Sequence, residues 1–211
     1  MIIQIFARDF QAPPRITKMC HDLTKTGFKV VRLLYSRINK KENTRVNGKE
    51  FTTIFVKGKF VDQQGSLNTI KLNTLLDFGL RGYKEILKLN KKEKIEILHC
   101  HRHSALIPAF FSKLAGIKAK IILDYHDPWT GESTLELNKK ISLINRLKIG
   151  LFHLFERISF KFIDHIIVVS DPQKELLQKR YRLENKKFTK VTNSAASSDQ
   201  NKFNPKRKNK K

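Results

Sequence analysis

Short apolar runs alternate with longer helical patterns along most of this 211-residue chain. The runs that predict strands cover residues 2–7, 29–34, 51–56, 95–100, 119–125, 165–170 and 188–192. This order is typical of βαβ units, whose right-handed crossovers give a mainly parallel sheet. The sequence therefore predicts an α/β fold: a doubly wound, mainly parallel, Rossmann-like sheet with helices on both faces.

Helices are predicted where apolar residues recur at helical spacing, over residues 16–25, 72–89, 104–115, 139–162 and 171–181. Gly27 and Gly116 are expected to end the first and third of these helices. Gly79 and Gly82 are expected to bend the second, because glycine weakens a helix interior. The Lys- and Asn-rich stretch 39–49 is interpreted as a loop.

Length and composition predict one α/β domain over residues 1–193, followed by a basic tail over residues 194–211. The tail resembles an interdomain linker and is expected to be disordered. With 43 Lys+Arg against 19 Asp+Glu, the net charge of +24 favours anionic partners, unless it reflects composition alone. Two cysteines fit a reducing cytoplasm, and the sequence holds neither a signal peptide nor an apolar run long enough to span a bilayer.

Polar residues gather at the predicted ends of three strands, and ligands of such sheets bind outside the carboxyl ends of the strands. One crevice is therefore expected to bring together Arg8 and Asp9; His99, His101 and His103; and Asp124, His126 and Asp127. This convergence is the main functional signal that the residues themselves provide.

Two of these motifs allow more than one interpretation. The spacing of His99, His101 and His103 places them on one face if the strand continues, where they line a ligand crevice or, alternatively, bind a transition metal. We expect a ligand crevice and no metal. His126, between two carboxylates, suits proton transfer or hydroxyl binding, with Glu132 near enough to join; alternatively, it is a loop histidine beside a capping Asp.

The predicted helix 139–162 also has two interpretations. In the simplest interpretation, an apolar stripe of this helix packs on the sheet. The stripe consists of Ile144, Leu147, Leu151, Leu154, Phe155, Ile158 and Phe162. Basic and apolar residues outside that stripe suit contact with an anionic membrane, and they are Arg146, Lys148, Ile149, His153 and Phe160. We expect a protein that is associated peripherally with the inner face of the cell membrane.

Glycine-rich phosphate-binding motifs are missing, since neither G-x-G-x-x-G nor G-x-x-x-x-G-K-[ST] occurs. The loop after the first strand reads RDFQAPPR instead. We therefore expect no cofactor and no autonomous binding of a dinucleotide.

Taken in order, the motifs resemble the N-terminal domain of the family-4-like GT-B glycosyltransferases. The segment IEILHCHRHSALIPAFFSKLAGIKAKIILDYHD is similar to the family's strand ending in H-x-H, its next helix and its strand ending in histidine. FERISFKFIDHIIVVSDPQKELL resembles the family's E-R helix and its D-x-I-I-V-V-S strand. KVTNSAASSDQNKFNP is similar to the stretch that leads out of the domain.

The resemblance implies a metal-free, retaining sugar transfer in a cleft between two Rossmann-like domains, with this chain supplying the acceptor side. A nucleotide-sugar is then the donor, and a lipid-linked or polysaccharide molecule the acceptor. His126 is expected beside the reacting sugar, Arg15 near the donor phosphates and His101 lining the cleft. The family's donor-binding residues belong to a C-terminal domain that this sequence lacks, so we expect the chain to be inactive without a partner that supplies it.

Two other functions remain open from the sequence. The chain is alternatively a non-catalytic, truncated or partner-dependent module that binds an acceptor or a membrane. The positive charge is the one feature that suggests nucleic-acid binding. The sequence has no recognition-helix, aromatic-platform or zinc-finger pattern, so we expect no nucleic-acid partner.

Overall fold

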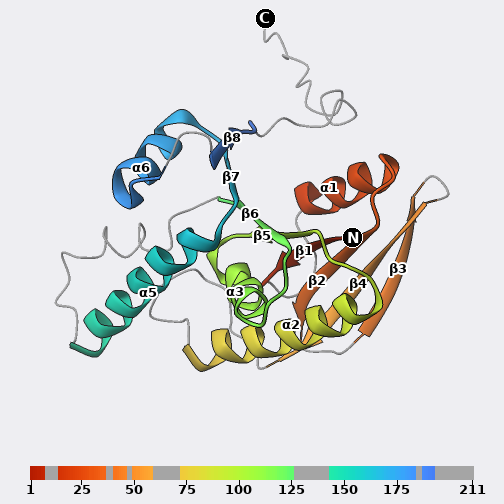
Figure 1. The fold of residues 1–211 in the computed structure, drawn as a ribbon, viewed down its shortest axis with the longest axis horizontal. Helices are drawn as coiled ribbons and strands as arrows, with labels where there is room; N and C mark the ends of the chain where they lie inside the picture. Colours follow the sequence, from red (N-terminus) through yellow and green to blue (C-terminus); the bar gives the residue numbers. More distant parts are fainter. Residues whose placement is uncertain are drawn as a thin grey trace, which may run out of the picture.

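The structure is a computed structural model that describes residues 1–7, 14–36, 40–46, 49–58, 72–125, 143–183 and 187–192. Strands and helices alternate through most of these segments, apart from three consecutive strands, β2 to β4 (Figure 1). Their bounds are β1 Ile2–Phe6, α1 Pro14–Lys25, β2 Val30–Ser36, β3 Lys40–Val46, β4 Lys49–Lys57, α2 Leu72–Lys92, β5 Ile97–His101, the 3-10 turn η1 His103–Ala105, α3 Leu106–Leu114, β6 Lys120–Asp124, α5 Leu143–Phe162, β7 His165–Val168, α6 Asp171–Tyr181 and β8 Phe188–Lys190.

The strands form one sheet in the order β3-β4-β2-β1-β5-β6-β7-β8. Every neighbouring pair is parallel except β3 and β4, so the predicted Rossmann-like α/β class is confirmed. The register places Gln4 beside His99, and His101 between Phe6 and Asp124. Three strands thus carry polar residues to neighbouring positions of the sheet.

The stretch 39–49 contains an edge strand, so its interpretation as a loop is wrong. Residues Lys40 to Val46 form β3, which pairs antiparallel with β4. Its side chains are mostly charged or polar, which hides the strand from an apolar pattern but suits the exposed edge of a sheet.

Helices cover both faces of the sheet, as predicted. On one face α1 packs through Ile16 and Cys20 against Phe6, Leu34 and Phe51. The other face carries α2, α3 and α5, whose buried residues join the larger apolar core with β1, β2, β5, β6 and β7. Within that layer α2 contacts α3, and α3 contacts α5.

Glycines end two helices as expected, whereas two others have a different role. Gly27 and Gly116 have φ angles of 97° and 86°, the left-handed region that glycine adopts without strain. Gly79 and Gly82 do not interrupt α2, which is helical from Leu72 to Lys92. They lie where α2 approaches α3: a Cβ atom on Gly79 would meet Ile107 at 2.4 Å.

The inward face of α5 differs from the one that its sequence predicted. Glu156, Ser159 and Phe160 are buried against the sheet, so the placement of Phe160 off the core face is wrong. The stripe that we expected in the core is mostly exposed, and its exposed members are Leu147, Leu151, Leu154, Ile158 and Phe162. Apolar residues occur on nearly every side of this helix, so periodicity alone could not identify the buried face.

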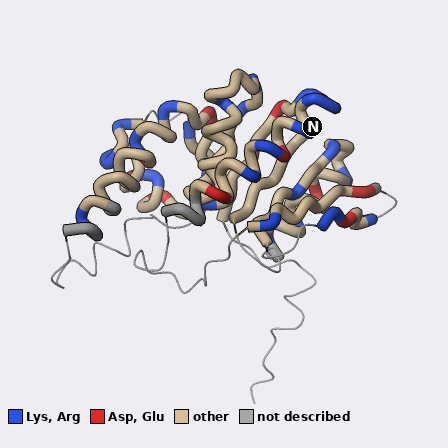
Figure 2. Tube along the Cα trace, turned by 90° about the horizontal axis from the view of Figure 1, so that it is seen from below, with Lys and Arg blue, Asp and Glu red and all other residues tan. Residues whose placement is uncertain are grey.

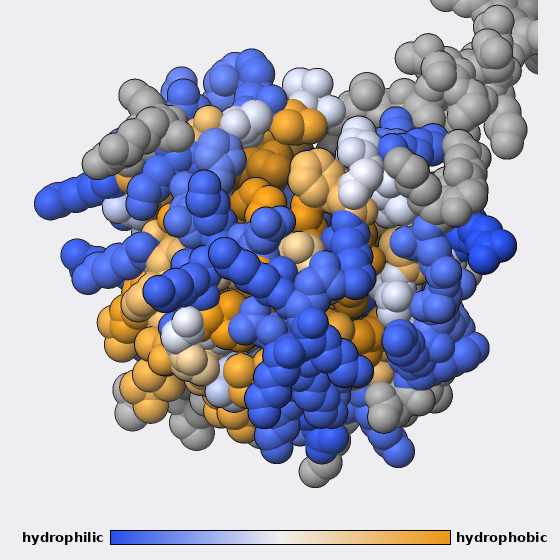
Figure 3. Space-filling view, turned by 45° about the vertical axis from the view of Figure 1, so that its right-hand side comes forward, coloured by the Kyte–Doolittle hydropathy of each residue, from blue (hydrophilic) through white to orange (hydrophobic). Residues whose placement is uncertain are grey.

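Basic residues are distributed over helices and strands along the whole trace (Figure 2). Hydrophilic side chains accordingly cover most of the face seen in Figure 3, with apolar patches between them. Among the helices that the structure describes, none combines the length and the apolar content that crossing a bilayer requires.

Candidate functional site

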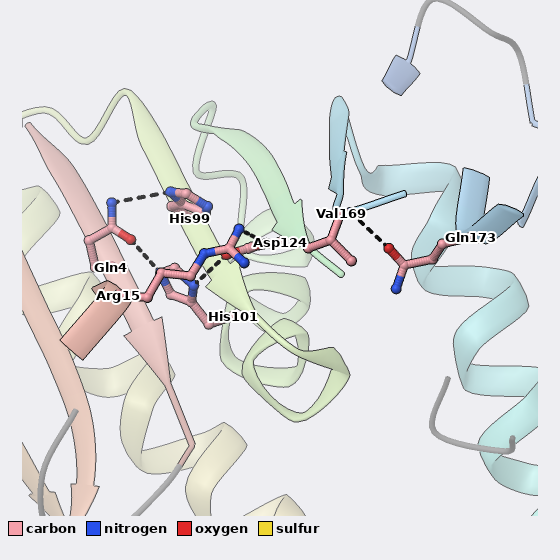
Figure 4. A network of polar contacts seen from close by, with 7 residues as sticks. All are labelled: Gln4, Arg15, His99, His101, Asp124, Val169 and Gln173. Carbon is pink, nitrogen blue, oxygen red and sulfur yellow. Dashed lines mark hydrogen bonds and ion pairs between the residues drawn. The ribbon is translucent and has the colours of Figure 1, made fainter. Parts of the chain in front are cut away.

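A chain of side-chain hydrogen bonds joins β1, β5, β6 and α1 on the α1 face of the sheet (Figure 4). Gln4 donates from Nε2 to Nδ1 of His99 at 3.1 Å, and its Oε1 accepts from Nε2 of His101 at 2.6 Å. Nδ1 of His101 lies 3.2 Å from Oδ2 of Asp124. Oδ1 of Asp124 accepts from Nη2 of Arg15 at 3.1 Å. Gln4, His99, His101 and Asp124 are all buried, and we call them, with Arg15, the strand-end network.

The hydrogen-bond partners of each imidazole nitrogen indicate which ring nitrogens in this network carry a proton. Nδ1 of His99 accepts from an amide, so the proton of this ring lies on Nε2 and the ring is neutral. Burial, together with the smaller effect of the positive charge of His101, lowers the pKa of His99 to about 3. His101 donates from both nitrogens, to an amide oxygen and to a carboxylate, and these partners favour the imidazolium form.

Arg15 is the member of the network that reaches solvent. Its side chain is 23% exposed, whereas that of Asp124 is fully buried. It lies in the first turn of α1. The ion pair therefore fixes one end of a guanidinium at the carboxyl edge of the sheet, where a phosphate or a carboxylate ligand would meet it.

The backbone at Arg102 separates His103 from the network. Arg102 has φ 73° and ψ 165°, a conformation that non-glycine residues rarely adopt, and β5 ends just before it at His101. The strand alternation that would place His103 beside His101 is thereby broken. The strand does not continue through the motif, so His103 does not share a face with His99 and His101, and the expectation that one crevice brings all three together is wrong for His103.

His103 belongs instead to a buried cluster between β6, α5 and α6. Its ring packs edge-on against Tyr125 and Phe160, and its Nε2 lies 3.3 Å from Oε1 of Glu156. Tyr181 donates its hydroxyl to Oε2 of Glu156 at 2.6 Å and stacks on Phe160. Burial lowers the pKa of His103 to about 3 and raises that of Tyr181. We call these five residues the α5–α6 cluster.

Several predicted site residues lie outside the described residues: Arg8, Asp9, His126, Asp127 and Glu132. His126 directly follows Tyr125, which packs on His103. Of the predicted membrane residues, Arg146 is exposed, and His153 accepts a hydrogen bond from Arg180 at 2.8 Å. Phe160 is buried, and the side chains of Lys148 and Ile149 are not among those described.

A metal ion fits the strand-end network poorly. One ligand atom each of His99, His101 and Asp124 lies within 4.8 Å of the others. However, the two imidazole rings stack at 4.6 Å with an angle of 24°, so they are nearly parallel and do not converge on one point. Asp124 already binds Arg15 and His101, and a cation would have to displace them. The residues are arranged for hydrogen bonding.

Sequence reasoning missed four members of these clusters, Gln4, Tyr125, Glu156 and Tyr181, and the first and third of them carry a signal. Gln4 is the single polar residue in the apolar strand IIQIF, where a buried amide needs partners. Glu156 is the single acidic residue of α5. A lone polar side chain inside an apolar element indicates a buried contact, but the partner cannot be identified from the local sequence.

Comparison with known proteins places this arrangement in a family. The family model of glycosyltransferase family 4 matches residues 16–194. None of the curated protein sequences matches the chain.

Solved structures of low sequence identity share the fold. A sucrose-phosphate synthase structure from Thermosynechococcus elongatus aligns with a TM-score of 0.57 at 13% identity, covering 92% of this chain and 89% of that one. The UDP-forming α,α-trehalose-phosphate synthase from Burkholderia vietnamiensis aligns with a TM-score of 0.52 at 11% identity, covering 85% and 43%. An E. coli trehalose-6-phosphate protein bound with UDP-2-fluoro glucose gives 0.52 at 9%, covering 82% and 41%. The present chain thus spans less than half the length of the two trehalose-phosphate proteins.

Proposed function

Because the chain belongs to glycosyltransferase family 4, we propose that it forms the acceptor-side half of a retaining GT-B glycosyltransferase. In this proposal a nucleotide-activated sugar is transferred to a lipid-linked or polysaccharide acceptor, at the inner face of the cell membrane. A second, donor-binding domain is required for transfer and comes from a longer chain or from a separate partner.

The observation that carries the proposal is the strand-end network. Buried Asp124 and Gln4 orient His101, and Asp124 also holds the partly exposed guanidinium of Arg15. Hydrogen-bond donors at the carboxyl edge of the sheet can bind hydroxyl and phosphate groups. Sugar acceptors carry hydroxyl groups, and nucleotide-sugars carry both. In this reading Arg15 meets the donor phosphates and His101 lines the acceptor side.

His126 is proposed as the residue beside the reacting sugar, together with Asp127 and Glu132. The resemblance to the family supports this role, and so does its place in the sequence directly after β6 and Tyr125. Within the α5–α6 cluster, His103 packs on Tyr125 and so supports the residue that directly precedes His126.

The test is deletion of the gene followed by complementation. Mass spectrometry of the envelope lipids and polysaccharides should show the loss of one glycosylated product, which the wild-type gene restores. His126→Ala and Arg15→Ala should fail to restore it. His165→Ala is the matched control, because this histidine lies at the amino end of β7 and bonds Thr189. An unchanged set of products after deletion would contradict the proposal.

The exposed stripe of α5 favours one alternative, a non-catalytic module that binds an acceptor or a membrane. The same complementation separates the two functions. If His126→Ala and Arg15→Ala both restore the lost product while substitutions in the stripe do not, binding without catalysis is the function.

A further inference from the structure

The edge strand β3 has an open side. In the part of the chain that the structure describes, β3 pairs with β4 alone and is the first strand in the order of the sheet. It lies at the outer edge of the sheet, at the right of Figure 1. Alternate residues of an antiparallel strand direct their N–H and C=O groups away from the partner strand. The open side of β3 therefore has backbone donors and acceptors that a further strand can use.

A groove of about 340 Å³ lies beside this edge, between β3, β4 and the second half of α2. Its apolar part consists of Ile54 and Leu89, which are partly buried against the core. The charged residues that line it are four lysines and one glutamate: Lys40, Lys41, Lys88, Lys92 and Glu85. The groove thus combines a small apolar surface with a cationic border.

Two of the four lysines are not neutralised by a neighbouring carboxylate. Lys88 donates to Glu85 at 2.7 Å, and Lys40 forms an ion pair with Glu42. Lys41 and Lys92 are exposed, and neither forms an ion pair with another residue that the structure describes. An acidic ligand in the groove would therefore meet positive charge that the chain itself leaves unmatched.

The register of β3 adds a further cation to the groove side of the sheet. Lys41, Asn43 and Arg45 share one face of β3, and this is the face of Ile54, which lies opposite Lys41 and joins the core on the α2 side. Glu50, opposite Arg45, is the one acidic residue of β4. A strand added to β3 with acidic residues at alternate positions would place carboxylates beside Lys41 and Arg45.

We propose that the open edge of β3 and this groove form a docking surface for an extended, acidic segment of a partner protein, which adds to the sheet as a further strand. In this mode of recognition the backbone hydrogen bonds supply affinity and the side chains supply specificity. The lysines keep apolar and basic strands away from the edge, and they favour a segment rich in Asp and Glu.

Two other occupants fit the surface less well. Antiparallel pairing of two β3 strands, centred on Asn43, would set Lys41 of one copy against Arg45 of the other, and like charges directly opposite are destabilising. A nucleic acid would find no stacking platform, because none of the residues that line the groove is aromatic.

The docking surface is separate from the strand-end network. Three strands, β4, β2 and β1, lie between β3 and β5 in the sheet. A segment that pairs with β3 does not occupy the network, so the inference stands independently of the proposed sugar transfer.

Fluorescence anisotropy with a labelled peptide of five Glu-Val repeats tests the proposal. The wild type should bind this peptide and should not bind five Lys-Val repeats. Lys41→Glu with Lys92→Glu should weaken binding of the Glu-Val peptide about tenfold or more. Lys118→Glu with Lys161→Glu is the matched control, because it makes the same change in net charge at two exposed lysines outside the groove. This variant should bind within about twofold of the wild type, since distant exposed charges are screened by salt.

A labelled peptide of five Glu-Pro repeats separates strand addition from attraction by charge alone. It carries the same charge, but proline cannot continue a strand ladder, so it should bind about tenfold more weakly. Hydrogen exchange over residues 40–46 should slow when the Glu-Val peptide binds, because the outer N–H groups of β3 gain partners. Equal affinity for the two acidic peptides, or unchanged exchange in β3, would overturn the proposal. Tighter binding of an oligothymidylate of equal charge would also overturn it and would identify a nucleic acid as the occupant.

Discussion

Arg15 and Asp124 lie 109 positions apart in the sequence, yet they form an ion pair at 3.1 Å between the first turn of α1 and the carboxyl end of β6. Asp124 is fully buried and binds His101 through its other oxygen. One carboxylate thus couples the position of a partly exposed guanidinium to that of a buried imidazole. The carboxyl ends of β5 and β6 are thereby joined in one hydrogen-bond network.

We expect Arg15→Met to lower the free energy of unfolding by about 1–3 kcal/mol, because it leaves a buried carboxylate with one charged partner fewer. Asp124→Asn should also destabilise the fold. The double variant should lose less free energy of unfolding than the two single variants lose together, with a coupling energy of about 1–2 kcal/mol. Urea denaturation of the four proteins in this cycle measures the coupling. Additive effects would show that the pair contributes nothing beyond its separate members.

Stability should fall as the pH drops below about 6.5, because the pKa of His99 and of His103 is lowered to about 3 in the fold. Between these values the unfolded chain takes up protons that the native rings do not, so acid favours unfolding. His99→Gln should reduce the slope of the free energy of unfolding near pH 5 by about 1.4 kcal/mol per pH unit. Identical slopes for the wild type and His99→Gln would contradict the prediction.

The fold class and most of the strands could be predicted because they depend on local patterns. Apolar runs such as KIILD and helix ends such as Gly27 and Gly116 are visible without any long-range contact. The strand β3 could not be predicted, because its polar side chains face solvent at the edge of the sheet.

The site could be predicted in part. Its three histidines and Asp124 were visible as a cluster at strand ends, but the backbone at Arg102, which turns His103 to the other face, has no sequence signature. The buried side of α5 carries a hydrogen bond from Tyr181 to Glu156, which joins residues 25 positions apart. Contacts of that kind require the tertiary structure.

Tyr181→Phe should lower the free energy of unfolding by about 1–3 kcal/mol, since it removes the donor to the buried carboxylate of Glu156. Glu156→Gln should lower the free energy of unfolding less in the Tyr181→Phe background than in the wild type, because the carboxylate has already lost this partner. Urea denaturation measures both effects. Tyr83→Phe serves as the control on α2, where the ring is half-buried against Phe111, and should change stability by less than about 0.5 kcal/mol.

Two helical glycines should respond in opposite directions to the same substitution. Gly79→Ala places a Cβ atom 2.4 Å from Ile107 and 3.0 Å from Phe111, so α2 and α3 must move apart, at a cost of about 1–3 kcal/mol. Gly150→Ala in α5 meets nothing within 4 Å and should stabilise the protein by about 0.5–1 kcal/mol, because alanine restricts the unfolded chain more than glycine does. Thermal unfolding of both variants measures the difference. If Gly79→Ala also raised the melting temperature, the close approach of α2 and α3 at this residue would be contradicted.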